Sequence, residues 1–170
     1  MKCWRILVLF LAVALVQGCS DRLADMQNQL AGVWVLQKRQ LDDGTVLVPP
    51  HVTGSISWVP ISSRKAHVTL NYLEDLKGDE PRRFNYAAST YEISTSAITR
   101  ARHVLIRQGY RSSAEASMSV YPKAKKVKGK ITVENNKIEI AHDESQWIFD
   151  GNTMTASYNG AWVDTWARMQ

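Results

Sequence analysis

Little in this 170-residue chain has the residue types and spacing that perform chemistry. Four histidines are present, without the spacing of metal ligands: His51, His67, His103 and His142. The triplet His142-Asp143-Glu144 is typical of a polar turn, not of a zinc-binding helix. The sequence shows no Gly-x-Ser-x-Gly elbow, glycine-rich phosphate loop or paired carboxylates. We therefore expect no metal, no other cofactor and no enzyme activity.

Cys19 has a context that points to covalent modification. Lys2 and Arg5 open the chain, and Ile6 to Val16 is an unbroken apolar run. The run has the length of a signal-peptide core and is too short to span a bilayer as a helix. Cys3 lies inside that segment, so its removal would leave no pair of cysteines for a disulfide.

The stretch Leu15-Val16-Gln17-Gly18-Cys19 resembles the bacterial lipobox, in which a cysteine is lipidated and becomes the new N-terminus. The resemblance implies removal of residues 1–18 and several acyl chains on Cys19. Two or more chains anchor a protein stably, at about 0.8 kcal/mol per buried methylene. In that family Ser20 favours the outer membrane, so we expect an envelope lipoprotein that faces the periplasm. The alternative is an ordinary cleaved signal with an incidental cysteine.

The remaining chain has the size and charge of one ordinary domain. Removal of residues 1–18 takes away Lys2 and Arg5 and no acid, so the net charge falls from +5 to +3. Such a mild charge does not indicate nucleic-acid binding. Residues 19–170 suffice for one domain with a real core.

Short alternating segments separated by turn signals dominate the chain after Ala31. In the segment Arg64 to Tyr72, apolar and polar side chains alternate from one residue to the next. Asn135-Asn136 and Asn159-Gly160 separate such segments, and Asn-Gly is among the strongest hairpin signals. About nine strands in consecutive hairpins are expected.

The sequence therefore predicts an all-β fold. A meander of this length exposes two edges unless it closes, which favours an antiparallel up-and-down barrel of about eight to ten strands. A two-sheet sandwich is the alternative. Leu23, Met26 and Leu30 stand at helical spacing, so residues 19–29 are expected to form a lipidated tether with a short helix that could also plug one end of the barrel.

The first and last strands resemble those of the lipocalin-like (calycin) family. The matching features are Leu30, Gly32, Trp34, the Asp43-Gly44 turn, Pro49, Gly54 and Trp166-Ala167-Arg168. The resemblance covers residues 30–170 and implies a barrel in which Trp34 packs across the closed end with Arg168 over its indole ring. Gly32, Trp34 and Arg168 are thus expected to be structural. The family resemblance also implies a cavity for a small ligand.

The inward faces of the strands supply the candidate lining of that cavity: Trp58, Leu70, Tyr72, Tyr91, Trp147, Tyr158 and Asp164. The same apolar residues could instead fill the core. Asp164 shares a face of the last strand with Arg168, and a buried aspartate needs a partner. Arg168 or a ligand group is the expected partner.

Five lysines gather in eight residues: Lys123, Lys125, Lys126, Lys128 and Lys130. They could contact anionic lipid headgroups. Alternatively they form a solvated strand face or protect a strand edge from aggregation.

Together these features predict an envelope lipoprotein whose barrel binds a small hydrophobic or amphipathic ligand. The alternative is a structural or accessory lipoprotein with a filled barrel that acts through its surface on the envelope or on a protein partner, which the sequence does not identify. An enzyme acting on a lipid-like substrate ranks third.

Overall fold

The computed structural model describes residues 22–75, 83–109 and 116–170. The expected signal segment (residues 1–18), Cys19 and the start of the tether lie outside these ranges. Within the described residues, no helix combines the length and the apolar character needed to cross a membrane.

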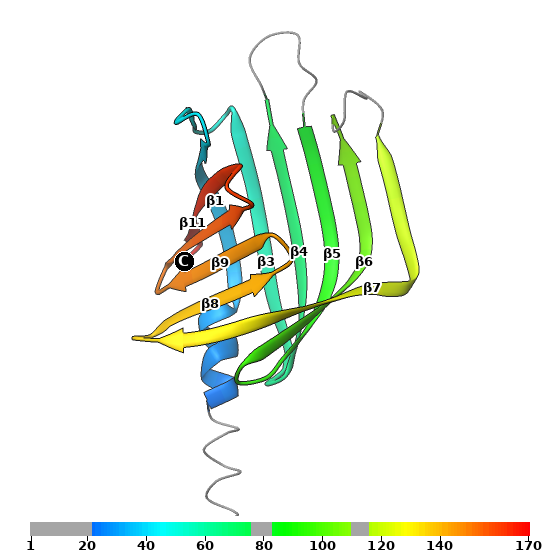
Figure 1. Ribbon diagram of the computed structural model, residues 1–170, viewed down its shortest axis with the longest axis vertical. Helices are drawn as coiled ribbons and strands as arrows, with labels where there is room; N and C mark the ends of the chain where they lie inside the picture. Colours follow the sequence, from blue (N-terminus) through cyan, green and yellow to red (C-terminus); the bar gives the residue numbers. More distant parts are fainter. Residues whose placement is uncertain (1–21, 76–82, 110–115) are drawn as a thin grey trace, which may run out of the picture.

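The strands form one closed antiparallel barrel (Figure 1). Apart from β2, strands that are neighbours in sequence are neighbours in the sheet, and β11 also pairs with β1, which closes the ring. Ten strands make the barrel, and the two-residue β2 is added at the edge of β1. This closure rules out the alternative of a two-sheet sandwich. The strands are β1 Gly32–Leu41, β2 Val46–Leu47, β3 Val52–Ser62, β4 Lys65–Glu74, β5 Arg83–Ile93, β6 Ala97–Gln108, β7 Ser117–Glu134, β8 Lys137–His142, β9 Ser145–Asp150, β10 Thr153–Tyr158 and β11 Trp162–Arg168.

The expected hairpin turns are present. Asn135 and Asn136 join β7 to β8 with φ values of 49° and 62°, and Asn159 and Gly160 join β10 to β11 with 44° and 71°. Positive φ at both central residues is what a type I′ turn requires, and its twist matches that of the flanking strands.

The barrel wall has two parts, which β7 connects. Strands β3 to β6 are 10 to 12 residues long and stand upright, whereas β8 to β11 are 6 or 7 residues long and run across them (Figure 1). β7 bends between them, because residues 121–124 lie opposite His103 alone. Past the bend, a Cβ on Gly129 would lie 2.4 Å from the carbonyl oxygen of Ala141, so only glycine fits there.

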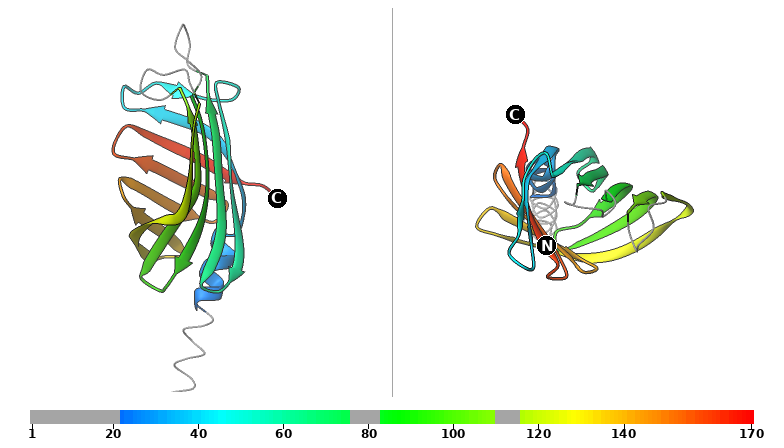
Figure 2. Two further views of the ribbon diagram at one scale, coloured as in Figure 1. Left: turned by 90° about the vertical axis from the view of Figure 1, so that its right-hand side faces the viewer. Right: turned by 90° about the horizontal axis from the view of Figure 1, so that it is seen from above.

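A helix over residues 22–30 packs against the end of the barrel that is lower in Figure 1, seen also from the side in Figure 2. Leu23, Met26 and Leu30 are at most 3 % exposed, so the apolar stripe of the helix faces the core. Gln27 Oε1 accepts a hydrogen bond of 2.9 Å from Trp58 Nε1. The helix is therefore a plug that belongs to the packed core.

Candidate functional site

Aromatic side chains fill the lower half of the barrel. Trp58 and Tyr91 are 1 % and 2 % exposed, and their ring centroids are 5.1 Å apart. Phe149 packs edge-on against Trp34, with ring centroids 5.2 Å apart, and the ring centroids of Trp147 and Tyr91 are 6.3 Å apart. These contacts place three of the candidate lining residues, Trp58, Tyr91 and Trp147, within the packed core.

Trp34 and Arg168 meet at the plugged end, as the family resemblance implies. The guanidinium carbon of Arg168 lies 4.6 Å from the ring centroid of Trp34, a cation–π contact. Trp34 Nε1 donates a hydrogen bond of 3.0 Å to the Leu30 carbonyl, and Arg168 Nη2 donates one to the Gln29 carbonyl. Gly32 has a φ of 120° beside the Arg168 side chain. All three residues join the barrel to its helical plug.

Asp164 points into the barrel, but its partner is Arg39 and not Arg168. Arg39 Nε and Nη2 each donate a hydrogen bond of 2.7 Å to one Asp164 carboxylate oxygen, and Arg39 Nη1 donates one of 3.2 Å to Glu74. All three side chains are at most 4 % exposed. The sequence concealed this pair because a bulge between Leu36 and Lys38 shifts the register of β1. The bulge turns Arg39 to the inner face.

Arg39 is also the centre of a stack of rings across the upper end of the barrel. Its guanidinium carbon lies 4.6 Å from the Tyr72 ring centroid and 4.7 Å from that of Trp162. Tyr158, which is 38 % exposed, stacks on the other side of Trp162 at 5.0 Å. Burial opposes the charge of Arg39, but the hydrogen bonds and charge of Asp164 outweigh it and raise the Arg39 pKa above its ordinary value. This Arg39 stack brings together three predicted residues, Tyr72, Tyr158 and Asp164.

Three arginines follow one another along the inner face of β6, and we call Arg100, Arg102 and Arg107 the arginine row. Their partners on β5 are Tyr91, Ser89 and Asn85, all of them buried. Arg100 Nη2 donates a hydrogen bond of 2.8 Å to Asp143, whose side chain is half exposed. Sequence analysis missed this row, although Ile98, Arg100 and Arg102 alternate on one face of a predicted strand.

Arg102 has no acidic partner in the described part of the chain, in contrast to Arg100. Its Nε is buried and makes no hydrogen bond. Burial lowers the pKa of Arg102 below its ordinary value, and the charges of Arg100 and Arg107 lower it further. A partly buried arginine beside two other positive charges is stabilised by an anion that binds next to it.

Neutral polar groups lie beside the lower end of the row. Tyr91 Oη and His142 Nε2 are 3.4 Å apart, and His142 Nδ1 is buried without a hydrogen bond. Burial raises the pKa of Tyr91, so the hydroxyl keeps its proton as a donor. Burial, followed by the charge of Arg100, lowers the pKa of His142 to about 4.

Protonation of His142 should make the protein less stable in acid. The unfolded chain binds a proton at His142 near the ordinary pKa of 6.5, whereas the folded protein does so only near about 4. Stability should therefore fall as the pH drops from about 6.5 to about 4, by roughly 3 kcal/mol. Urea denaturation at pH 7 and pH 4 measures this loss. His142→Phe should remove most of it and His51→Gln should not. An identical pH dependence in wild type and His142→Phe would contradict the assignment.

An apolar row lies on the inner wall between Arg102 and Arg107. Leu70, Ala87 and Leu105 are directly paired across β4, β5 and β6, and all three remain partly exposed. Leu70 is thus a predicted lining residue whose side chain lies on the inner wall and is only partly covered by the packed core. The wall offers apolar contact next to a cation.

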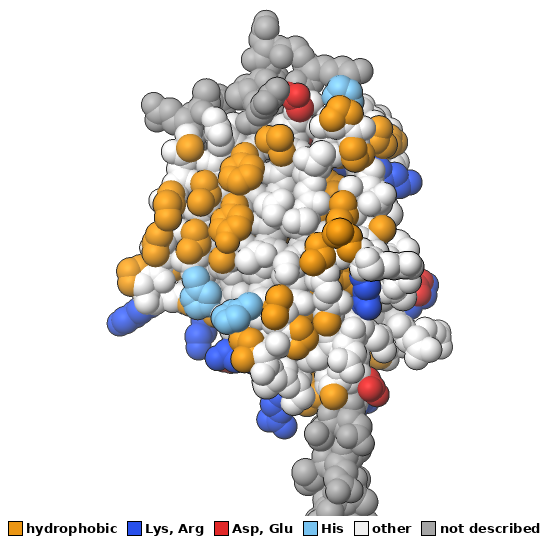
Figure 3. All heavy atoms as spheres, turned by 180° about the vertical axis from the view of Figure 1, so that it is seen from behind, with side chains coloured by type: hydrophobic (Ala, Val, Ile, Leu, Met, Phe, Trp, Pro, Cys, Tyr) orange, Lys and Arg blue, Asp and Glu red, His pale blue; other side chains and the backbone are white. Residues whose placement is uncertain are grey.

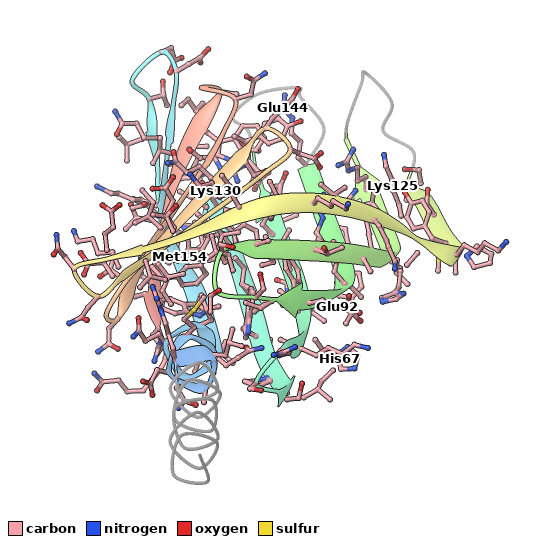
Figure 4. All side chains as sticks on the ribbon, turned by 60° about the horizontal axis from the view of Figure 1, so that its bottom comes forward. His67, Glu92, Lys125, Lys130, Glu144 and Met154 are labelled. Carbon is pink, nitrogen blue, oxygen red and sulfur yellow. The ribbon has the colours of Figure 1, made fainter. Side chains whose placement is uncertain are left out.

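The predicted lysine cluster is divided by the fold. Lys125 pairs with Arg102 near the bend of β7, whereas Lys126, Lys128 and Lys130 pair with Ala101, Thr99 and Ala97 on the other face. Figure 4 shows Lys125 and Lys130 well apart along β7. All five lysines are exposed, Lys123 lying within the bend.

The described residues contain a further depression and no metal-binding cluster. A shallow pocket lies between the lower turns, lined among others by Ser62, Arg64, Glu92 and Thr99, and it contains none of the predicted residues. No group of three or more histidine, cysteine, aspartate or glutamate side chains is placed to hold a metal there.

Comparison with known proteins gives no family for this chain. No protein-family model, curated protein or solved structure matches it. The lipocalin-like and lipoprotein resemblances therefore remain expectations from the residues quoted above.

Proposed function

We propose that the upper half of the barrel binds a small amphipathic molecule that carries an anionic group. The observation that supports this most directly is Arg102, an inward-facing arginine without an acidic partner among the described residues and with a buried, unbonded Nε. Arg102 would contact the anionic group. Leu70, Ala87 and Leu105 would contact the apolar part.

The proposed setting is the bacterial envelope. Acylation of Cys19 would anchor the protein in the outer membrane, with the barrel in the periplasm. A lipid-rich compartment supplies amphipathic anions, which are ligands of the proposed class. The proposal covers binding or carriage and no reaction.

A second candidate function follows from the packing of the lower half. Trp58, Tyr91 and Trp147 already fill that region. If the upper half also holds no ligand, the protein would act through its outer surface. The binding experiment separates the two functions.

Native mass spectrometry of the protein purified without detergent is the first test. A reproducible adduct that disappears on organic extraction supports binding. Titration with dodecanoate and with dodecanol, followed by tryptophan fluorescence, then isolates the role of the charge. We expect dodecanoate to bind more tightly, and Arg102→Gln to weaken its binding at least about tenfold, because hydrogen bonds to charged groups contribute about 1.5–3 kcal/mol.

The matched control is Arg64→Gln, which removes an exposed arginine near the lower turns. It should leave both affinities unchanged, and Arg102→Gln should leave dodecanol binding unchanged. A bare mass, together with no binding of either probe, would reject the binding function. Equal affinity for the two probes would reject the role of Arg102.

A further inference from the structure

The outer side of the wall formed by β5, β6 and β7 carries apolar side chains, where a soluble barrel normally exposes polar ones. Tyr86, Ile106 and Met118 form one row across β5, β6 and β7, and Ala88, Val104 and Val120 form the next. Met118 and Val120 are 65 % and 59 % exposed. We call these six residues the outer apolar face.

The face lies on the opposite side of the wall from the arginine row. Asn85 and Ala87 pair with the inward Arg107 and Leu105, so strand alternation turns Tyr86 and Ala88 outward. Figure 3 shows columns of apolar side chains on this outer surface, with no acidic side chain among them. A contiguous exposed apolar patch of this kind marks a contact surface.

Lysines border the outer apolar face. Lys126, Lys128 and Lys130 occupy the outer positions of β7 past its bend, and all are exposed. In the described part of the chain none of them forms an ion pair. The surface that covers this face must therefore be apolar in the middle and negatively charged at its border.

We propose that the outer apolar face docks on an anionic lipid bilayer, with Met118 and Val120 among the acyl chains and the three lysines at the headgroups. A barrel wall is convex, so a second copy would touch it only along a narrow strip, whereas a lipid surface deforms to cover it. A second copy also has no row of carboxylates in this face to pair with the lysines. The inference is independent of the proposed ligand.

A fluorescent label placed on the face tests the proposal. The full chain is used with Cys3→Ser and Cys19→Ser, so that the label has one site and no acyl chain is attached. One variant carries Met118→Cys, and the matched control carries Val163→Cys, which replaces an exposed apolar residue of β11 on the far wall. Vesicles contain nitroxide-labelled lipid and either phosphatidylglycerol or phosphatidylcholine only.

With phosphatidylglycerol vesicles, we expect quenching at position 118 to exceed that at position 163 at least threefold. Comparing the two variants, which share the same N-terminal segment, separates docking of this face from tethering through that segment. Replacing Lys126, Lys128 and Lys130 with glutamine should weaken vesicle binding on the order of 100-fold, since each lysine near an anionic surface contributes roughly fivefold. Lys38→Gln with Lys137→Gln, two exposed lysines elsewhere, should have little effect.

Equal quenching at the two positions would overturn the proposal. Preferential quenching at position 118 that persists in phosphatidylcholine or in the triple lysine variant would overturn the anionic-lipid occupant. A change at position 118 that depends on protein concentration without vesicles would identify a second copy instead and would also overturn it.

Discussion

Arg39→Met is expected to lower the free energy of unfolding by about 3–5 kcal/mol, because it leaves the buried carboxylate of Asp164 without its cation. Arg39 makes two hydrogen bonds of 2.7 Å to Asp164 and one of 3.2 Å to Glu74. It also lies between the rings of Tyr72 and Trp162. Methionine keeps much of the volume between the rings but removes every hydrogen bond and the charge.

Urea denaturation at pH 7 measures this effect. The double variant Arg39→Met with Asp164→Leu should recover a large part of the loss, because it removes the stranded aspartate with its cation. Arg64→Met, at an exposed arginine, should change stability by no more than about 0.5 kcal/mol. A loss below about 1 kcal/mol for Arg39→Met would show that the buried network is not needed for stability.

Trp34→Ala is expected to cost about 3–5 kcal/mol, the range for removing a buried aromatic side chain. The Trp34 side chain is fully buried, packs on Phe149 and donates a hydrogen bond to the Leu30 carbonyl. Its loss should therefore also release the N-terminal helix from the end of the barrel. Thermal unfolding gives the stability, and amide hydrogen exchange in residues 22–30 gives the release of the helix.

Two milder variants separate the contributions at this end of the barrel. Trp34→Phe keeps most of the packing and loses the hydrogen bond, so a loss of about 1–2 kcal/mol is expected. Arg168→Ala removes the cation–π contact, which should cost about 1–2 kcal/mol and alter the emission of Trp34. Unchanged exchange in residues 22–30 of Trp34→Ala would contradict the role of Trp34 in holding the plug.

The fold gives the two ends of one barrel different physical properties. The lower half is closed by a helix and packed with Trp34, Trp58 and Phe149. The upper half contains the Arg39 stack, and on the inner wall the partly exposed Leu70 lies level with Leu105, between Arg102 and Arg107. The largest losses of stability are therefore expected from substitutions at the lower end and in the Arg39 stack. Loss of ligand binding is expected from substitution of Arg102.

Local patterns in the sequence predicted most of the strands and their meander order, with about nine strands expected and ten present in the barrel. Asn159-Gly160 takes up the positive φ values of its turn whatever surrounds it, and the alternation of Ala66, Val68 and Tyr72 matches their buried face. The length of the meander then favoured a closed barrel, because open edges would be left unpaired. The contact of Arg168 with Trp34 followed from the family resemblance and is present.

The candidate site depended on tertiary structure, because single-residue bulges change which face a side chain occupies. Strict alternation from Trp34 and Leu36 places Arg39 outside, and the bulge between Leu36 and Lys38 brings it inside. Asp164 is 125 residues away in sequence, so its pairing with Arg39 exists only because β11 closes on β1. The lysines, which the sequence presents as one cluster, are divided by strand alternation past the bend of β7: Lys125 pairs with Arg102 of the inner face, and Lys126, Lys128 and Lys130 lie on the outer face. Sequence by itself determined the strands, their turns and the need to close the barrel, since these follow from local backbone preferences and edge pairing. Only the tertiary structure decided which charged groups share the interior, since that depends on register between strands distant in the chain.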